Sequence, residues 1–290
     1  MISMSLSQKQ VPDTVSLPEK LRVEKGERLT RDELHVILSA HHAALRSGEG
    51  VLKDRHRNAV TSVRHGNDWF CVKEYRSQGL LDRIKDRFRK SRALRAWKGA
   101  SHLRKHGIAA PEAVSQVELD GKSYLVTRFI TGAVALNLLL YERFSGRLDR
   151  AEVAAKRTMV RKLGQWLRSI HDLGIYHDDW SAKNILATQH NDQWVFHMLD
   201  MESVLPRKRL TYRRRVKNLG QISDAPFGIT STDRMRFLLA YAGDDTALTR
   251  GNFPVDVIAA ERLRAKKRTK QWVKSRIRKA KLRRKMETVK

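Results

Sequence analysis

The first half of the chain carries the alternation of apolar and polar positions that predicts β-strands. Between residues 51 and 75, the segments VLKDRHRN, AVTSVRH and WFCVKEYR are rich in β-branched and aromatic residues, and the turn HGND separates the last two. The segment VSQVELDGKSYLVTRFI (114–130) is expected to form a hairpin with Asp120-Gly121 at its turn. These patterns predict a sheet-rich unit.

Apolar residues at helical spacing predict the other elements. Thr30 and Glu33 form a capping-box pattern before a helix over 31–46, on which His41 and His42 are expected at the surface. Further helices are expected over 80–106, 133–144, 149–173, 211–222 and 232–241, another begins at Pro254, and 193–204 alternates like a strand. The second half is therefore expected to be mostly helical.

The segment IYHDDWSAKNIL (175–186) places a polar cluster between apolar anchors. Its pattern is H-x-D-x-x-x-x-N, ending at Asn184; Asp200 follows at the end of an apolar stretch, and Lys73 lies in an upstream strand. This order supplies the parts for phosphoryl transfer from a nucleotide. A strand lysine holds phosphates, a carboxylate orients the acceptor hydroxyl, and Asn and Asp oxygens bind Mg²⁺.

Two neighbouring acids compete for the role of base in this segment. The offset of five residues to Asn184 favours Asp179 over Asp178. His177 is expected to brace the loop rather than to take part in the chemistry.

These residues resemble the bacterial lipopolysaccharide kinases, relatives of protein kinases that phosphorylate Kdo or heptose in the inner core. The resemblance covers about residues 50–245 and rests on VKEYR, LLDRIKDRFRKSRALRAWKGASHLRKHGIAAPEA, YLVTRFITG, IYHDDWSAKNIL, MLDMESV and RRRVKNLGQI. It implies an α+β, two-lobed protein-kinase-like fold with a small sheet-rich N-lobe and a helical C-lobe. The expected division is an N-terminal arm and helix (1–48), an N-lobe (49–130), a C-lobe (131–250) and a basic helical tail (251–290).

The resemblance also implies roles for single residues. Asp179 resembles the catalytic base, Asn184 a metal ligand, Asp200 the metal-binding Asp of the DFG position, and Lys73 the lysine that holds the phosphates of ATP. The adenine is expected at the hinge backbone, formed by Thr127, Arg128 and Phe129. ATP and Mg²⁺ are the implied cofactors.

The sequence departs from the protein-kinase pattern at several positions. No G-x-G-x-x-G loop is present, and in the matching turn Arg55 and Arg57 are expected to contact phosphate with their side chains. Ala96 stands where protein kinases have a helix glutamate that pairs with the strand lysine. The sequence does not indicate which residue pairs with Lys73 instead. Glu202 places a second acid near the DFG position and is expected to support Mg²⁺. Lys183 is expected to reach a γ-phosphate or an anionic sugar, with solvent exposure as the alternative.

The charge of the chain indicates an anionic partner. The net charge is +28, and the positive residues concentrate in 82–105, 207–217 and 261–290; the last segment holds fifteen Lys and Arg against two Glu. One cysteine excludes an internal disulfide and fits a cytoplasmic protein. The N-terminus lacks the apolar run of a signal peptide, so none is expected. The longest apolar block, AVALNLLL, is too short to span a bilayer.

A long activation segment and the A-P-E motif are missing, which favours a small molecule or glycolipid over a protein as acceptor. The expected enzyme is an ATP-dependent kinase acting on a hydroxyl of a lipopolysaccharide inner-core sugar, Kdo or heptose, or of a similar anionic glycolipid. It is expected to bind the anionic cytoplasmic face of the inner membrane through 261–290. The alternative is an atypical protein kinase or pseudokinase whose basic tail binds RNA or another anion; nucleic acid is the less favoured partner.

Overall fold

The structure is a computed structural model that describes residues 29–76, 91–119, 121–191, 193–222, 228–245, 248, 252–267 and 269–270. The chain divides into two compact units. The first comprises Met1–Ala93 and Ala113–Phe129, and the second comprises Leu94–Glu112 and Ile130–Lys290.

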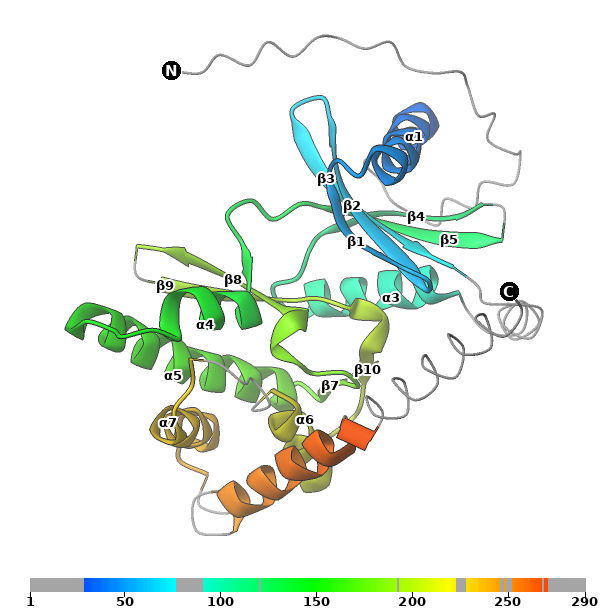
Figure 1. Ribbon diagram of the computed structural model, residues 1–290. Coiled ribbons are helices and arrows are strands. Elements are labelled where there is room, and N and C mark those ends of the chain that lie inside the picture. The colour runs from blue at the N-terminus through cyan, green and yellow to red at the C-terminus, as the bar shows by residue number, and fades with distance from the viewer. Residues whose placement is uncertain are drawn as a thin grey trace, which may run out of the picture. The chain divides into compact units, whose positions relative to one another are not determined.

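The first unit is built on a five-stranded antiparallel sheet in the order β1-β2-β3-β5-β4 (Figure 1). Its strands are β1 (Val51–Arg55), β2 (Asn58–His65), β3 (Asp68–Tyr75), β4 (Ala113–Leu119) and β5 (Lys122–Arg128). The strands predicted between 51 and 75 and the hairpin predicted over 114–130 are therefore confirmed. Gly121, in the turn between β4 and β5, has φ of +71°, a conformation that glycine adopts without steric cost.

Helix α1 (Arg31–Ser47) packs on this sheet. Its capping box is formed as predicted, with Thr30 and Glu33 bonding each other's backbone N–H groups. Leu34, Ile37 and Leu38 recur at helical spacing and join the buried cluster formed by sheet residues such as Phe70 and Val126. The helix is thus part of the hydrophobic core of the first unit.

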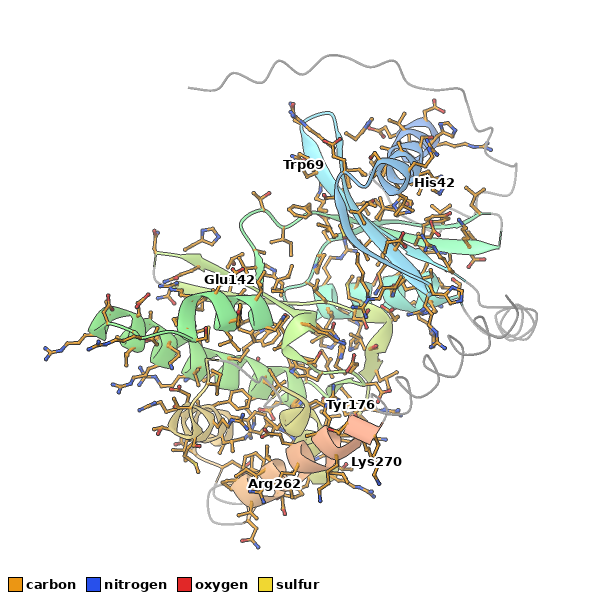
Figure 2. The ribbon with its side chains drawn as sticks, in the orientation of Figure 1. His42, Trp69, Glu142, Tyr176, Arg262 and Lys270 are labelled. Atoms are coloured by element: carbon orange, nitrogen blue, oxygen red, sulfur yellow. The ribbon has the colours of Figure 1, made fainter. Side chains whose placement is uncertain are left out.

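The prediction that His41 lies at the surface is wrong. Its side chain is 0% exposed and continues the apolar stripe of α1, with Nδ1 lying 2.8 Å from Thr61 Oγ1 and Nε2 lying 3.1 Å from Glu74 Oε2. The carboxylate of Glu74 also accepts a hydrogen bond from Arg76 Nε at 2.6 Å and pairs with Lys122 Nζ at 3.2 Å. Three basic side chains thus satisfy one buried acid. The neighbouring His42, labelled in Figure 2, is 33% exposed at its side chain.

We expect Glu74→Gln to destabilise the first unit by about 3 kcal/mol, because it leaves the buried His41 and the partly exposed Arg76 and Lys122 without their acidic partner. Burial by itself would raise the pKa of Glu74, but the hydrogen bonds from His41 and Arg76 and the charge of Lys122 lower this pKa from 4.5 to about 2. The ionised group therefore contributes stability above pH 4.5, and this contribution is lost as the pH falls toward 2. Urea unfolding at several pH values measures both effects.

Glu118→Gln is the matched control, because Glu118 lies on β4 of the same sheet with an exposed side chain. We expect it to change the free energy of unfolding by less than about 0.5 kcal/mol. Equal effects of the two substitutions at neutral pH would contradict the role given to the Glu74 network.

The second unit is mainly helical (Figure 1). Its helices are α3 (Arg92–Lys105, with its first two residues in the first unit), α4 (Leu136–Phe144), α5 (Arg150–Asp172), α6 (Tyr212–Ile222), α7 (Ser231–Ala242) and a helix over residues 253–267. All of these helices were predicted, although residues 80–90 of the helix expected over 80–106 lie outside the described part of the chain. α4 begins later than expected because β6 (Val134–Ala135) pairs with β8 (Ile185–His190).

Short strands complete the second unit. β8 pairs with β9 (Gln193–Met198), and β7 (Ile175–His177) pairs with β10 (Val204–Pro206). The strand expected over 193–204 is therefore two strands, β9 and β10, separated by a turn at Asp200. Among the described residues, no helix has both the length and the apolar character required to cross a bilayer.

Candidate active site

The loop between β7 and β8 is held by buried apolar anchors and exposes its acids. Ile175, Trp180 and Ile185 are almost completely buried, whereas the side chains of Asp178 and Asp179 are 63% and 43% exposed. The loop ends in the short 3₁₀ helix η1 (Ala182–Asn184), which leads into β8. The apolar residues on both sides thus fix the backbone while the two carboxylates reach the surface.

Asn184 is locked to Asp179. Its Nδ2 donates to the backbone carbonyl of Asp179 at 2.8 Å and lies 3.4 Å from Asp179 Oδ2. The Asp179 carbonyl oxygen and Asp179 Oδ2 are both acceptors, so the amide nitrogen of Asn184 must face them. Asn184 Oδ1 therefore points away from Asp179. The five-residue offset read from the sequence therefore corresponds to a direct contact.

The β8–β9 hairpin brings Asp200 to the same end of the sheet as Asn184. Ile185 pairs with Met198 in the ladder, and the amide of Leu199 donates to the Asn184 carbonyl at 2.9 Å. Asp200 follows with φ of +59° and ψ of +47°, a left-handed conformation that is uncommon for residues other than glycine. Such conformations concentrate at functional sites, because the surrounding structure must impose them.

His177 joins the loop to this turn. It is 1% exposed, and its Nε2 donates to the Leu199 carbonyl at 3.1 Å. Burial lowers the pKa of His177, although its hydrogen bond to Leu199 and the charges of Asp200 and Asp179 oppose the change, so the ring is neutral at pH 7. These contacts agree with the bracing role expected for His177.

Asp179 is surrounded by positive charge. Arg264 donates to its Oδ1 at 3.0 Å, and Lys183 Nζ lies 3.6 Å from its Oδ2. Partial burial would raise the pKa of Asp179, but the Arg264 hydrogen bond and the Lys183 charge outweigh it and lower this pKa below 3.8. The carboxylate is therefore ionised at neutral pH. The Asp178 carboxylate pairs instead with Lys217, at 3.2 Å.

Side chains of helix α6 form hydrogen bonds with the backbone of the loop between β7 and β8. The sequence had not indicated these residues. The Nδ2 of Asn218 donates to the His177 carbonyl at 2.8 Å, and the Nε2 of Gln221 donates to the Asp178 carbonyl at 2.8 Å. Asn218 is also bonded to His171, which is buried on α5. The side chains of α6 thus satisfy backbone groups that the tight loop leaves unpaired. The only local signal for them was their place in RRRVKNLGQI.

Gly99 of α3 allows a close approach to the turn after Asp200. A Cβ atom at position 99 would lie 2.1 Å from the Met201 carbonyl oxygen, so no larger residue fits without a shift of the backbone. The turn that carries Asp200 and Glu202 is therefore backed directly by a helix. The Glu202 side chain is half-buried.

The other predicted residues lie in the first unit. Lys73 is on β3, with its Nζ 5.0 Å from the centroid of the Tyr75 ring. Arg55 and Arg57 are exposed at the β1–β2 turn, where their carbonyls accept hydrogen bonds from Arg76.

The hinge residues end β5. The Thr127 hydroxyl lies 3.5 Å from the Cys71 carbonyl, and the Arg128 guanidinium pairs with Asp68 at 2.9 Å. The amide of Phe129 donates to the Trp69 carbonyl at 2.9 Å, so it is already used by the sheet. Adenine binding at this hinge therefore depends on other backbone groups, and it stays a prediction.

Comparison with known families decides the class of the protein. The profile of the lipopolysaccharide kinase (Kdo/WaaP) family matches residues 45–241, which is more than half of the chain. The chain belongs to this family. It is a kinase, an enzyme that transfers a phosphoryl group and uses ATP. Among curated proteins, no sequence matches.

Two solved structures are similar to this chain. The structure described as WaaP in complex with acyl carrier protein has a TM-score of 0.53 and 20% identity, with 76% of this chain and 91% of that chain covered. A mutant form of the kinase domain of Mycobacterium tuberculosis PknI has a TM-score of 0.44 and 19% identity, with 74% of this chain and 93% of that chain covered. The match to the WaaP structure confirms the predicted α+β, protein-kinase-like fold.

The residues of this kinase fit a magnesium ion. Asn184 and Asp200 offer an amide oxygen and a carboxylate, which are the hard oxygen ligands that Mg²⁺ prefers, and Glu202 adds a carboxylate on the adjoining turn. The metal would neutralise charge on the phosphates of ATP. The roles of these residues, like those of Asp179, Lys183 and Lys73, stay predictions.

Proposed function

We propose that this kinase transfers the γ-phosphoryl group of ATP to a hydroxyl of a lipopolysaccharide inner-core sugar, Kdo or heptose, or of a similar anionic glycolipid. The observation that carries the proposal is the arrangement of Asp179. Its ionised, partly exposed carboxylate is locked by Asn184 and lies in a cluster of basic side chains. A carboxylate so placed can receive a hydroxyl while the surrounding charge attracts an anionic acceptor.

In the proposed reaction, Asp179 orients the acceptor hydroxyl and accepts its proton. The hydroxyl oxygen forms a bond to the γ-phosphorus as the bond between that phosphorus and the β–γ bridging oxygen breaks, and ADP leaves. Asn184 and Asp200 would hold Mg²⁺, with Glu202 in support, and the ion would neutralise charge on the phosphates. Lys73 holds the α- and β-phosphates, and Arg55 and Arg57 contact phosphate from the β1–β2 turn.

The charges near the loop favour an anionic sugar over a cationic one. Lys183, Lys217 and Arg264 form ion pairs with Asp178 and Asp179, so three basic side chains lie against these two acids. Repulsion between like charges would weaken the binding of a polyamine-type acceptor such as an aminoglycoside. An acceptor with carboxylates or phosphates fits this charge.

A panel of purified acceptors tests the proposed function. The full chain is incubated with Mg-ATP and Kdo-lipid A, a heptose-containing inner core, an aminoglycoside or a generic protein substrate, and ADP and phosphorylated products are measured. We expect phosphorylation of an inner-core acceptor and none of the aminoglycoside. Phosphorylation of the protein substrate alone would favour the atypical protein kinase.

We also propose that the basic C-terminal segment holds the enzyme on an anionic membrane surface. Residues 271–290 contain nine Lys and Arg and one Glu. Each basic residue near an anionic bilayer contributes about 1 kcal/mol. Since Phe253 and Val257 of the preceding helix are buried, the truncation that tests this proposal should begin after Lys270.

Removal of residues 271–290 is expected to abolish most of the binding to vesicles that contain phosphatidylglycerol, with the largest difference at low salt. Vesicle sedimentation measures the binding, with neutral phosphatidylcholine vesicles and an RNA duplex as parallel ligands. Circular dichroism and ATP turnover should stay at wild-type values. Loss of RNA binding without loss of vesicle binding would contradict the membrane proposal and support the RNA alternative.

A further inference from the structure

The helix over residues 253–267 is anchored in the core of the second unit. Phe253 and Val257 are each 1% exposed, and the Phe253 ring stacks on Tyr241 of α7 with centroids 5.8 Å apart. At the start of the helix, Tyr212 of α6 donates to Asp256 Oδ2 at 2.6 Å. The first turns are thus fixed by apolar packing and by a hydrogen bond.

The next turn of this helix packs against α6 and α7. Ala260 lies so close to Gly220 of α6 that an added Cβ at position 220 would be 2.8 Å from the Ala260 Cβ. Glu261 forms an ion pair with Arg234 of α7. Residues 253, 257, 260, 261 and 264 follow one another at helical spacing, so Arg264 continues the face that packs inward.

Arg264 reaches the proposed base from this anchored face. Its guanidinium donates to Asp179 Oδ1 at 3.0 Å, and its side chain is 24% exposed. A hydroxyl bound to the same Oδ1 at about 2.7 Å therefore lies within about 6 Å of the guanidinium. Any acceptor that Asp179 orients must lie beside Arg264.

We propose that Arg264 is an acceptor-specificity residue, which binds a carboxylate or phosphate group next to the hydroxyl that is phosphorylated. This inference rests on the proposed function, and it names the feature of the acceptor that the enzyme recognises. The planar guanidinium matches the geometry of both anions and can contact them while it borders Asp179.

Lys183 and Lys217 extend the same positive surface. Lys183 pairs with Asp179 and Lys217 with Asp178, and the side chains of both lysines are more than half exposed. An anionic acceptor would meet three basic groups from three separate elements: η1, α6 and the helix over residues 253–267. Arg264 lies beyond the residues matched by the family profile, 45–241, so this contact depends on the part of the chain that follows the matched region.

The test compares anionic sugars with neutral counterparts. The full chain is assayed with Kdo and its uncharged methyl ester, and with a heptose monophosphate and the free heptose. Arg264→Gln is measured beside Arg264→Lys, which keeps the charge but loses the planar fork. Arg262→Gln is the matched control, because Arg262 is an exposed residue of the same helix (Figure 2). Binding is measured by calorimetry or NMR, and kcat and KM are measured for acceptor and for ATP.

We expect Arg264→Gln to weaken the binding of the recognised anionic sugar about 10- to 100-fold and to raise its KM by a similar factor. Arg264→Lys should restore part of the affinity. Binding of the neutral counterpart, the KM for ATP and the behaviour of Arg262→Gln should stay within about twofold of the wild type. If Arg264→Gln separates Kdo from its methyl ester, the recognised anion is a carboxylate. If it separates heptose monophosphate from free heptose, the recognised anion is a phosphate.

Two outcomes would overturn the inference. Equal losses on the anionic and neutral acceptors would mean that Arg264 only positions Asp179, and higher turnover by Arg264→Gln would mean that the contact inhibits the enzyme. If the wild type phosphorylates none of the acceptors, the proposed function fails. The binding measurements then still decide whether Arg264 recognises an anionic sugar.

Discussion

Asp179→Asn is expected to lower phosphoryl transfer by about 10²- to 10⁴-fold, because the amide cannot accept the proton of the acceptor hydroxyl. The substitution keeps the size of the side chain and one oxygen acceptor for Arg264, so the loop should keep its conformation. The dissociation constant for Mg-ATP should change by less than about threefold, since Asp179 acts on the acceptor. Steady-state transfer and calorimetric titration with ATP measure the two effects.

Asp178→Asn is the control for the register of the loop. Asp178 is the preceding residue, and its carboxylate contacts Lys217 at the surface. The loss of an exposed ion pair of this kind costs less than about 1 kcal/mol, so most of the transfer activity should remain. A larger loss in Asp178→Asn than in Asp179→Asn would show that the wrong acid has been assigned as the base.

Asp200→Asn is expected to abolish turnover and to weaken the binding of Mg-ATP at least tenfold, because it removes a charged oxygen ligand from the proposed metal site. Asparagine is the informative substitution, since it tolerates the left-handed backbone conformation of Asp200 better than alanine does. The loss should therefore reflect ligand chemistry rather than a distorted turn. Binding of a fluorescent ATP analogue is measured with Mg²⁺ and with a chelator.

The control for this site is Glu202→Gln, on the same turn. We expect a smaller loss than for Asp200→Asn, because Glu202 is assigned a supporting role. Circular dichroism should show that both variants keep the wild-type fold. If Asp200→Asn binds Mg-ATP as tightly as the wild type, the metal site must be assigned to other residues.

The sequence predicted most of the secondary structure because local periodicity governs it. The strands between 51 and 75 and the capping box of α1 follow from residues that are close in the chain. The five-residue spacing of Asp179 and Asn184 also corresponds to a local contact in the structure. These features need no information about distant segments.

The errors and omissions arose from contacts between distant residues. His41 was assigned to the surface, although it continues the apolar stripe of α1, and its burial depends on Glu74, 33 residues away. Asn218 contacts the loop across 41 residues, and Arg264 contacts Asp179 across 85. A polar side chain on a helix gives no local signal of a distant partner, so only the folded chain reveals these roles.

The most direct test of the account is to locate the phosphoryl group after a reaction with γ-labelled ATP. The wild type and Asp179→Asn are incubated with Mg²⁺ and with either Kdo-lipid A or its heptose-containing counterpart, mild acid releases the core sugars, and mass spectrometry identifies the labelled fragment. We expect label on a core sugar with the wild type and a loss of about 10²-fold or more with Asp179→Asn. Label on the protein alone, or equal labelling of the sugar by both proteins, would contradict it.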